Sequence, residues 1–518
     1  MSDTAQEQSP RRRRGAFSSR RVFILAAIGS AVGLGNIWRF PYVAYDEGGG
    51  AFMIPYIVAL LTAGLPFLML DYGLGHRNRG SAPLSFARIS RKGEPLGWWQ
   101  VAICFVIAIY YAAIIGWAAV YAILSIDKSW GSDPATYFSA EFLKSADPGV
   151  SMDFVGGLLV PLLLVWVVLL VVLALGVQKG IGMISVIFIP ILVVAFVALV
   201  IQALLLDGAA EGLEALFTPD WGALRGTSVW IAAYGQIFFS LSVGFGIMIT
   251  YSAYVDRKEN MTGSGLVVGF ANSGFELLAG IGVFAALGFI ASSTGGDPGA
   301  AAQEGGIGLA FIAFPTIINE APAGALLGVL FFVSLVIAGI TSLISVLEVV
   351  IAAVRDKFEL PRVTAVLAVA VPAAVASTLL FSTTTSLYAL DIIDHFINHF
   401  GILLVAVVSM VMLAWVFRAV PTLARHLNRH GSLKLGYVWM ALVSVITPAA
   451  LAWVLVDQFR TDIETPYEGF PTWMLGWLGW GVAGGVIVVG LLASLVPWRR
   501  VTSLDVEDDA DKTVKEDA

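Results

Sequence analysis

The sequence predicts an all-α integral membrane protein with twelve membrane-spanning helices. Of its 518 residues, 58% are apolar and only 13% are charged, whereas about a quarter of the residues in a soluble domain are charged. Most apolar stretches approach the ~20 residues that a helix needs to cross a bilayer, and they far exceed barrel strands. The expected spans are 22–46, 52–75, 97–126, 154–176, 180–206, 228–254, 262–291, 324–354, 363–382, 388–417, 434–456 and 472–497.

Lysine and arginine are distributed unevenly between the two sets of loops. If the N-terminus lies inside, the cations left outside are Arg39, Lys128, Lys144, Arg225 and Arg460, out of 30. Because cytoplasmic loops carry the excess of these residues, both termini are expected in the cytoplasm and the chain in the cell membrane. The first 21 residues are polar and basic and show no cleavable signal peptide.

Two further features of composition limit the interpretation. The single cysteine, Cys104, lies in an apolar span and excludes an internal disulfide framework. The segment after Arg500 is acidic and lacks aromatic residues, so disorder is expected there.

The first span contains a segment that suits a continuous helix badly. Residues 29–41 include three glycines, each costing about 1 kcal/mol of helix stability, and Pro41. A helix break in a membrane is tolerated where it lines an enclosed cavity, so Asn36 and Arg39 beside this break predict a buried polar site that could hold an ion. Alternatively, Gly29 and Gly33 form a small-residue seam that only packs two helices.

A second interrupted segment, residues 240–246, lies five spans later. It carries two glycines and two serines between Trp230 and Tyr254. Glycine-interrupted spans at corresponding positions of two halves indicate a substrate site between inverted repeats, here spans 1–5 and 6–10.

Other polar residues also lie within apolar spans. Glu276, beside Asn272, is costly to insert and marks an ion path or proton relay. Asp391 and Asp394 lie at an outer helix end and form either a solvated rim or a functional pair with Arg39. His395 and His399, four residues apart, leave a metalloenzyme as a weak alternative.

Residues 29–41 (GSAVGLGNIWRFP) and 47–56 (EGGGAFMIPY) strongly resemble the neurotransmitter:sodium symporter family. The resemblance continues through residues 230–240, 249–254 and 338–342, and is closest to bacterial amino-acid members such as the leucine transporter. It implies a 5+5 inverted-repeat fold of the leucine-transporter type with broken helices 1 and 6.

The resemblance also implies two sodium sites built from oxygen ligands and no organic cofactor. The first site would use Ala31, Asn36, Ser240 and Asn272. The second would use Gly29, Val32, Ala338, Thr341 and Ser342. A serine at position 240 replaces the usual threonine, which keeps the hydroxyl.

The implied substrate is an amino acid, because Gly33 stands where monoamine-transporting relatives have an aspartate. The expected substrate contacts are Ala31, Gly33, Gly35, Ile107, Tyr111, Phe239, Ser240, Ser242, Phe245, Ser342 and Val346. Glu276 occupies the position where chloride-dependent relatives have a serine, so it is expected to replace chloride. The expected gates are Arg39 with Asp394 outside, and Arg14 with Asp356 near Tyr254 inside.

The expected organisation is a basic N-terminal segment (1–21), a transport core (22–417, with repeats 22–206 and 228–417), helices 11 and 12 (434–497) and an acidic tail (498–518). The expected function is sodium-coupled import of a neutral, mainly apolar amino acid by alternating access, independent of chloride. The alternatives are a sodium-dependent transporter of another small carboxylate or amine, a transporter-like sensor, and a channel. The expected partners are the amino acid, sodium and the bilayer, with a homodimer possible and no nucleic acid.

Overall fold

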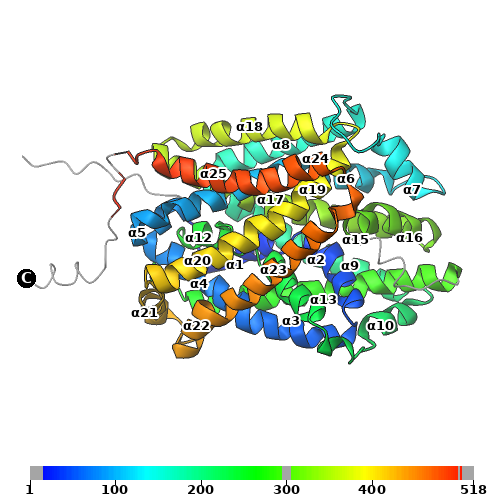
Figure 1. Ribbon diagram of the computed structural model, residues 1–518. Helices are drawn as coiled ribbons and strands as arrows, with labels where there is room; N and C mark the ends of the chain where they lie inside the picture. The colour runs from blue at the N-terminus through cyan, green and yellow to red at the C-terminus, as the bar shows by residue number, and fades with distance from the viewer. Residues whose placement is uncertain (1–15, 295–304, 500–501, 505–518) are drawn as a thin grey trace, which may run out of the picture.

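The computed structural model describes residues 16–294, 305–499 and 502–504 (Figure 1). The described chain is helical apart from its connections and two isolated β-bridges, Gly49 with Pro219 and Phe154 with Thr383. The long helices run along one common direction, as the spans of a membrane bundle do (Figure 1). Arg14 and the acidic residues from Asp505 onward lie outside the described residues.

The first half of the chain forms the following helices: α1 (Arg20–Ala31), α2 (Leu34–Asp46), α3 (Met53–Ala59), α4 (Leu65–Asn78), α5 (Ala82–Ile89), α6 (Glu94–Leu124), α7 (Pro134–Thr136), α8 (Gly156–Gly176), α9 (Met183–Leu204) and α10 (Ala209–Phe217). The second half forms α11 (Ser228–Ser240), α12 (Ile247–Ser252), α13 (Met261–Thr294), α15 (Gly305–Gly308), α16 (Phe314–Glu320), α17 (Gly324–Phe358), α18 (Arg362–Phe381), α19 (Ser386–Phe396), α20 (Leu404–Val411), α21 (Val420–His430), α22 (Tyr437–Ala441), α23 (Thr447–Glu464), α24 (Thr472–Met474) and α25 (Val482–Leu495).

Short π-helical and 3₁₀ segments connect several of these helices. The π-helical segments are Leu60–Gly64, Tyr137–Phe142, Val177–Gly182, Leu309–Ala313, Ile397–Leu403, Met412–Val416, Leu442–Ile446 and Leu475–Gly481. The 3₁₀ segments are Gly50–Phe52, Arg91–Gly93, Ala223–Arg225 and Tyr467–Gly469.

Nine helical runs of the described chain are long and apolar enough to cross a membrane, and up to ten if the bent pair α1 and α2 counts as one span. One run, Gly156–Leu204, has 49 residues, but Gly176 inside it has a φ of 89°. Its two parts pack differently, α8 against α6 and α18, and α9 against α13 and α17. The expected all-helical membrane class is confirmed.

Helices α6 and α17 form the centre of the bundle, where they pack against each other. The peripheral helices instead expose large apolar side chains, such as Val171 on α8, Val371 on α18 and Leu492 on α25. A soluble protein rarely exposes such extensive apolar surface, so these side chains mark the surface that faces lipid.

The apolar segment at 309–318 is too short to span a membrane and too apolar to remain in solvent, so its sequence predicts that it packs back onto the bundle. It forms the π-helical segment Leu309–Ala313 and most of α16. Phe311 and Phe314 are fully buried, and the Phe314 ring stacks 3.7 Å from Phe331 of α17. This expectation is confirmed, whereas helices α5, α10 and α21, which lie between the expected spans, were not predicted.

One end of the bundle carries most of the basic loops. The loops after α4 and before α21 meet there, and the C-terminal segment after α25 reaches the same place, on the left of Figure 1. We call it the basic end and the opposite one the far end.

Candidate functional site

Helices α1 and α2 meet at an angle of 54° within the first glycine-rich segment. The side chain Oδ1 of Asn36 accepts a hydrogen bond from the Gly33 amide (2.9 Å), and the Tyr111 hydroxyl accepts one from the Leu34 amide (3.2 Å). The first amides of a helix have no partner within it. Asn36 and Tyr111 therefore satisfy the amides that the interruption frees.

The second glycine-rich segment separates α11 from α12. Ser242, Gly244 and Gly246 have φ values of 52°, 87° and 88°. Glycine adopts this conformation readily, but it strains Ser242. The Gly244 amide donates to Oδ2 of Asp71 (3.3 Å), so a buried carboxylate of α4 holds this interruption in place.

The two interruptions face each other across one backbone carbonyl, that of Ser30. It accepts hydrogen bonds from the hydroxyls of Ser242 (2.9 Å) and Ser342 (3.2 Å). The end of α1, the α11–α12 connection and the middle of α17 therefore meet at this point.

A cavity of about 220 Å³ opens beside this meeting point. It is lined by every residue that was expected to contact substrate: Ala31, Gly33, Gly35, Ile107, Tyr111, Phe239, Ser240, Ser242, Phe245, Ser342 and Val346. Arg39, Asp391 and Asp394 also line it, and Asp391 accepts a hydrogen bond from Tyr467 (3.2 Å) in the loop before α24. The charged part of the cavity therefore lies toward the far end.

The four residues of the expected first sodium site lie together. The side-chain amide of Asn272 lies 2.9 Å from Asn36 Nδ2, 3.0 Å from Ser240 Oγ and 3.3 Å from the Ala31 carbonyl oxygen. Carbonyl, amide and hydroxyl oxygens are the ligands that a hard cation prefers. All four residues are buried, so the oxygens form a compact neutral cluster beside the cavity.

The residues of the expected second site lie where α1 passes close to α17. A Cβ at Gly29 would lie 3.4 Å from Cβ of Thr341 and 2.7 Å from Ile189. The Thr341 hydroxyl donates to its own helix, to the carbonyls of Ile337 or Ala338 (both 3.0 Å). Because Gly29 has no side chain, α1 can approach α17 this closely. Val32 is the C-cap residue of α1.

Glu276 is fully buried on α13. It accepts hydrogen bonds from the Tyr56 hydroxyl and from Gln236 Nε2 (2.6 Å), and Gln236 in turn lines the cavity. A buried carboxylate is costly unless donors satisfy its oxygens, and these two side chains meet that need.

The expected outer gate residues share the cavity but do not form an ion pair with each other. The Arg39 guanidinium lies 4.0 Å above the Phe239 ring. Asp394 Oδ1 instead accepts hydrogen bonds from Tyr110 (2.6 Å) and Asn398 (2.9 Å). An aromatic face attracts a cation, so Arg39 rests on Phe239 in this conformation.

Hydrogen bonds join the elements on the basic-end side of the cavity. Tyr254 donates to Oε1 of Glu348 (2.8 Å), and its carbonyl accepts a hydrogen bond from the Phe17 amide (3.2 Å). Asp356 accepts one from the Ser81 amide (2.9 Å). The described elements therefore close the cavity on this side.

The metal alternative finds no support in the described part of the chain, which holds no group of three or more His, Cys, Asp or Glu able to bind a metal. His395 pairs with Asp462 (2.8 Å), and His399 bonds to the carbonyl of His395 (2.8 Å).

Sequence reasoning missed the supporting roles of Tyr56, Gln236 and the Ser30 carbonyl. The only signal in the sequence is a polar group within an apolar span, which does not reveal its partner. Asp71 gives the same signal, and its contact with Gly244 lies 173 residues away in the sequence.

A helical membrane bundle with interrupted helices around a midway cavity, closed at one end, is the architecture of a transporter and not of an enzyme. The chain belongs to the sodium:neurotransmitter symporter family, whose model matches residues 14–135 and 128–500. It is therefore a sodium-dependent symporter.

Named relatives agree with this family. An uncharacterized sodium-dependent transporter of Methanocaldococcus jannaschii is 40% identical over 89% of this chain and 93% of its own length. One of Bacillus subtilis is 32% identical over 67% of this chain and 74% of its own length. A sodium- and chloride-dependent GABA transporter 2 of Macaca fascicularis is 28% identical over 91% of this chain and 84% of its own length.

Proposed function

We propose that this chain imports a neutral, mainly apolar amino acid with sodium, by alternating access and without chloride. The observation that carries the proposal is the cavity beside the oxygen cluster of Asn36 and Asn272, because substrate and cation would then touch each other. Binding energy shared between two ligands in contact is what couples their transport.

We further propose twelve spans, both termini in the cytoplasm, and two inverted repeats. Gly176 would divide the run 156–204 into two spans, and α11 with α12 would form one interrupted span. The basic end would then face the cytoplasm, in agreement with the distribution of Lys and Arg. In this orientation the described conformation is closed toward the cytoplasm.

Apolar cargo follows from the walls of the cavity. Ile107, Phe245 and Val346 offer no charge partner for a substrate side chain. The substrate carboxylate would approach the sodium cluster, the α2 N-terminus and the Tyr111 hydroxyl, since a helix N-terminus favours an anion. Arg39, Asp391 and Asp394 lie toward the far end and would close above the cargo.

The deciding experiment is binding and uptake by the purified protein in liposomes, with each of the twenty amino acids as competitor. Neutral apolar amino acids should compete best, and only in sodium, not in choline or potassium. Equal affinity without sodium contradicts the coupling, and strong competition by glutamate or lysine contradicts the cargo class. Sodium-dependent binding without uptake would instead indicate a sensor with this fold.

A further inference from the structure

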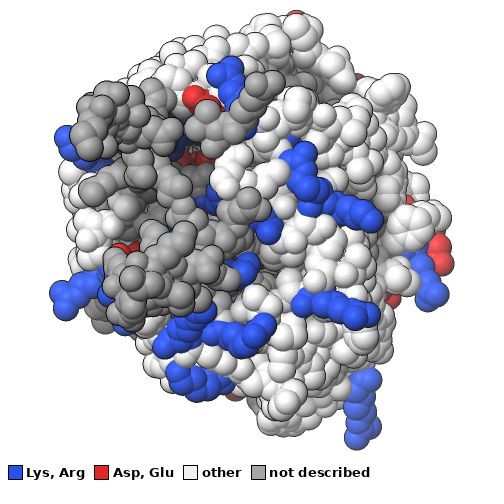
Figure 2. All heavy atoms as spheres, turned by 90° about the vertical axis from the view of Figure 1, so that its left-hand side faces the viewer, with Lys and Arg blue, Asp and Glu red and all other residues white. Residues whose placement is uncertain are grey.

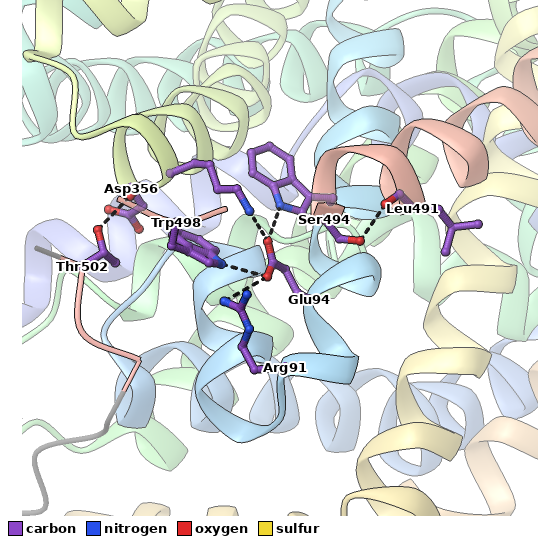
Figure 3. A network of polar contacts seen from close by, with 9 residues as sticks. Arg91, Glu94, Asp356, Leu491, Ser494, Trp498 and Thr502 are labelled. Atoms are coloured by element: carbon purple, nitrogen blue, oxygen red, sulfur yellow. Dashed lines mark hydrogen bonds and ion pairs between the residues drawn. The ribbon is translucent and has the colours of Figure 1, made fainter. Parts of the chain in front are cut away.

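The segment after α25 is anchored at the basic end of the bundle by a buried ionic contact (Figure 3). Trp498 Nε1 donates to Oε2 of Glu94 on α6 (2.8 Å). The ammonium of Lys357, on α17, pairs with Oε1 of the same glutamate and lies 4.4 Å from the Trp498 ring. Because Glu94 and Lys357 are buried, this contact fixes where the C-terminal segment starts.

The next residues keep to the same surface. The Thr502 hydroxyl donates to Oε1 of Glu359 (2.9 Å) or the Asp356 carbonyl (3.3 Å). The Arg88 guanidinium donates to the Ser503 carbonyl from Nε (3.1 Å) and Nη2 (2.8 Å). The segment after α25 therefore runs from its contact with α6 and α17 to a contact with α5.

It ends in a cleft of about 350 Å³ at the basic end, whose lining includes Leu504 itself. Three arginines from different elements line this cleft: Arg77 of α4, Arg88 of α5 and Arg418 before α21. Figure 2 shows this end of the molecule, where Lys and Arg side chains clearly outnumber Asp and Glu. A cleft lined by cations attracts an anionic partner.

The sequence places such a partner directly after Leu504. The following residues include Asp505, Glu507, Asp508, Asp509 and Asp511. An extended chain covers about 3.4 Å per residue. The first four of these carboxylates therefore lie within roughly 17 Å of chain length from a residue that already lines the cleft.

We propose that this arginine cleft binds the acidic tail of its own chain, residues 505–518. A tethered ligand has an effective concentration near millimolar, so the tail has an advantage over a free anion. Docking there would continue the anchored segment beyond its contacts with Asp356 and Glu359. It would also link the basic end of α17 to α5.

Docking can be measured as a distance in the full-length protein. The only native cysteine, Cys104, is fully buried, so His430→Cys and Ala510→Cys introduce the two accessible thiols for spin labels. In nanodiscs of neutral phosphatidylcholine we expect one short, narrow distance. Salt at 1 M, where the screening length falls to about 3 Å, should broaden it.

The charge variants decide which cations hold the tail. Arg77→Gln with Arg418→Gln should broaden the distance. Arg425→Gln with Lys258→Gln removes two exposed charges outside the cleft and should not. The double variant Arg77→Glu with Arg418→Glu should no longer show the short distance. Replacing residues 505, 507, 508 and 509 of that variant with lysine should restore it. If the spin-label distance is the same in the cleft variants as in the native cleft, the proposal is wrong.

A lipid phosphate is the competing anion. If phosphatidylglycerol in the nanodisc lengthens the distance, the cleft binds lipid headgroups in a membrane and the proposal is wrong. An unchanged distance supports tail docking. None of these readouts requires transport, so failure of the proposed function would not affect them.

Discussion

The Tyr111 hydroxyl lies 3.1 Å from the position that a Cβ at Gly33 would occupy, and Ser342 Oγ lies 3.5 Å from it. This glycine therefore keeps the cavity open at the interruption between α1 and α2, where Tyr111 also accepts the Leu34 amide.

The substitution Gly33→Ala should accordingly weaken substrate binding. A methyl group in so tight a space costs about 1–3 kcal/mol, which corresponds to roughly 5- to 150-fold in Kd. Equilibrium binding of a radiolabelled amino acid in saturating sodium measures the effect. Gly274→Ala, on α13 with nothing within 4 Å of its Cβ position, is the matched control. Equal losses in both variants would point to a general helix effect.

Asn272→Ala should raise the sodium concentration needed for half-maximal substrate binding. The amide contacts three of the proposed ligand groups, and leaving buried polar groups unsatisfied costs about 1–3 kcal/mol. A shift of roughly 5- to 150-fold is expected from sodium titrations. Ser185→Ala removes a buried hydroxyl that only bonds its own helix (2.8 Å) and should leave the titration unchanged.

The native protein should transport without chloride, because an ionised Glu276 would take the place of a bound anion beside the oxygen cluster. Glu276→Ser should abolish transport in gluconate, and added chloride should partly restore it. Uptake in the two anions measures this, with Glu211→Ser, at an exposed position, as the control. Chloride dependence of the native protein would disprove the role of Glu276.

His426 should make stability fall in acid. It lies on α21 beside His76 (2.9 Å between ring nitrogens), and burial, His76 and Arg77, Arg429 and Arg257 lower its pKa from 6.5 to about 3. Because the folded pKa is depressed, the neutral ring's contribution is complete above pH 6.5 and is lost as pH falls toward 3.

Thermal unfolding of the detergent-solubilised protein between pH 7 and pH 4 checks this expectation. Each unit below 6.5 should cost up to about 1.4 kcal/mol through this residue. His426→Gln should make the slope shallower, while His430→Gln, exposed on the same helix, should not. A native profile without a slope in this range contradicts the expectation.

The sequence was informative where a local rule governs structure. Glycines and Pro41 weaken a helix wherever they stand, so the segments at 29–41 and 240–246 could be singled out. Apolar length likewise predicted the membrane class, and the apolar segment at 309–318 could be placed against the bundle because it is too short to span.

Contacts between distant segments could not be predicted from such rules. Nothing in the sequence shows that Gln236 reaches Glu276 or that Asp71 binds the Gly244 amide. Nor does the sequence show that Arg39 lies over Phe239, because a long side chain can reach either an aromatic face or a carboxylate. The anchoring of Trp498 on Glu94 joins residues 404 positions apart.

The Ser30 carbonyl, shared by the hydroxyls of Ser242 and Ser342, limits how the bundle can move. Separating the three segments would break both hydrogen bonds to a buried acceptor, and a buried polar group left unsatisfied costs about 1–3 kcal/mol. The interruption in α1–α2, that in α11–α12 and the middle of α17 should therefore travel as one rigid block. Conformational change would then occur by sliding of the helices that surround this block. The bound substrate would move with the block and keep its contacts.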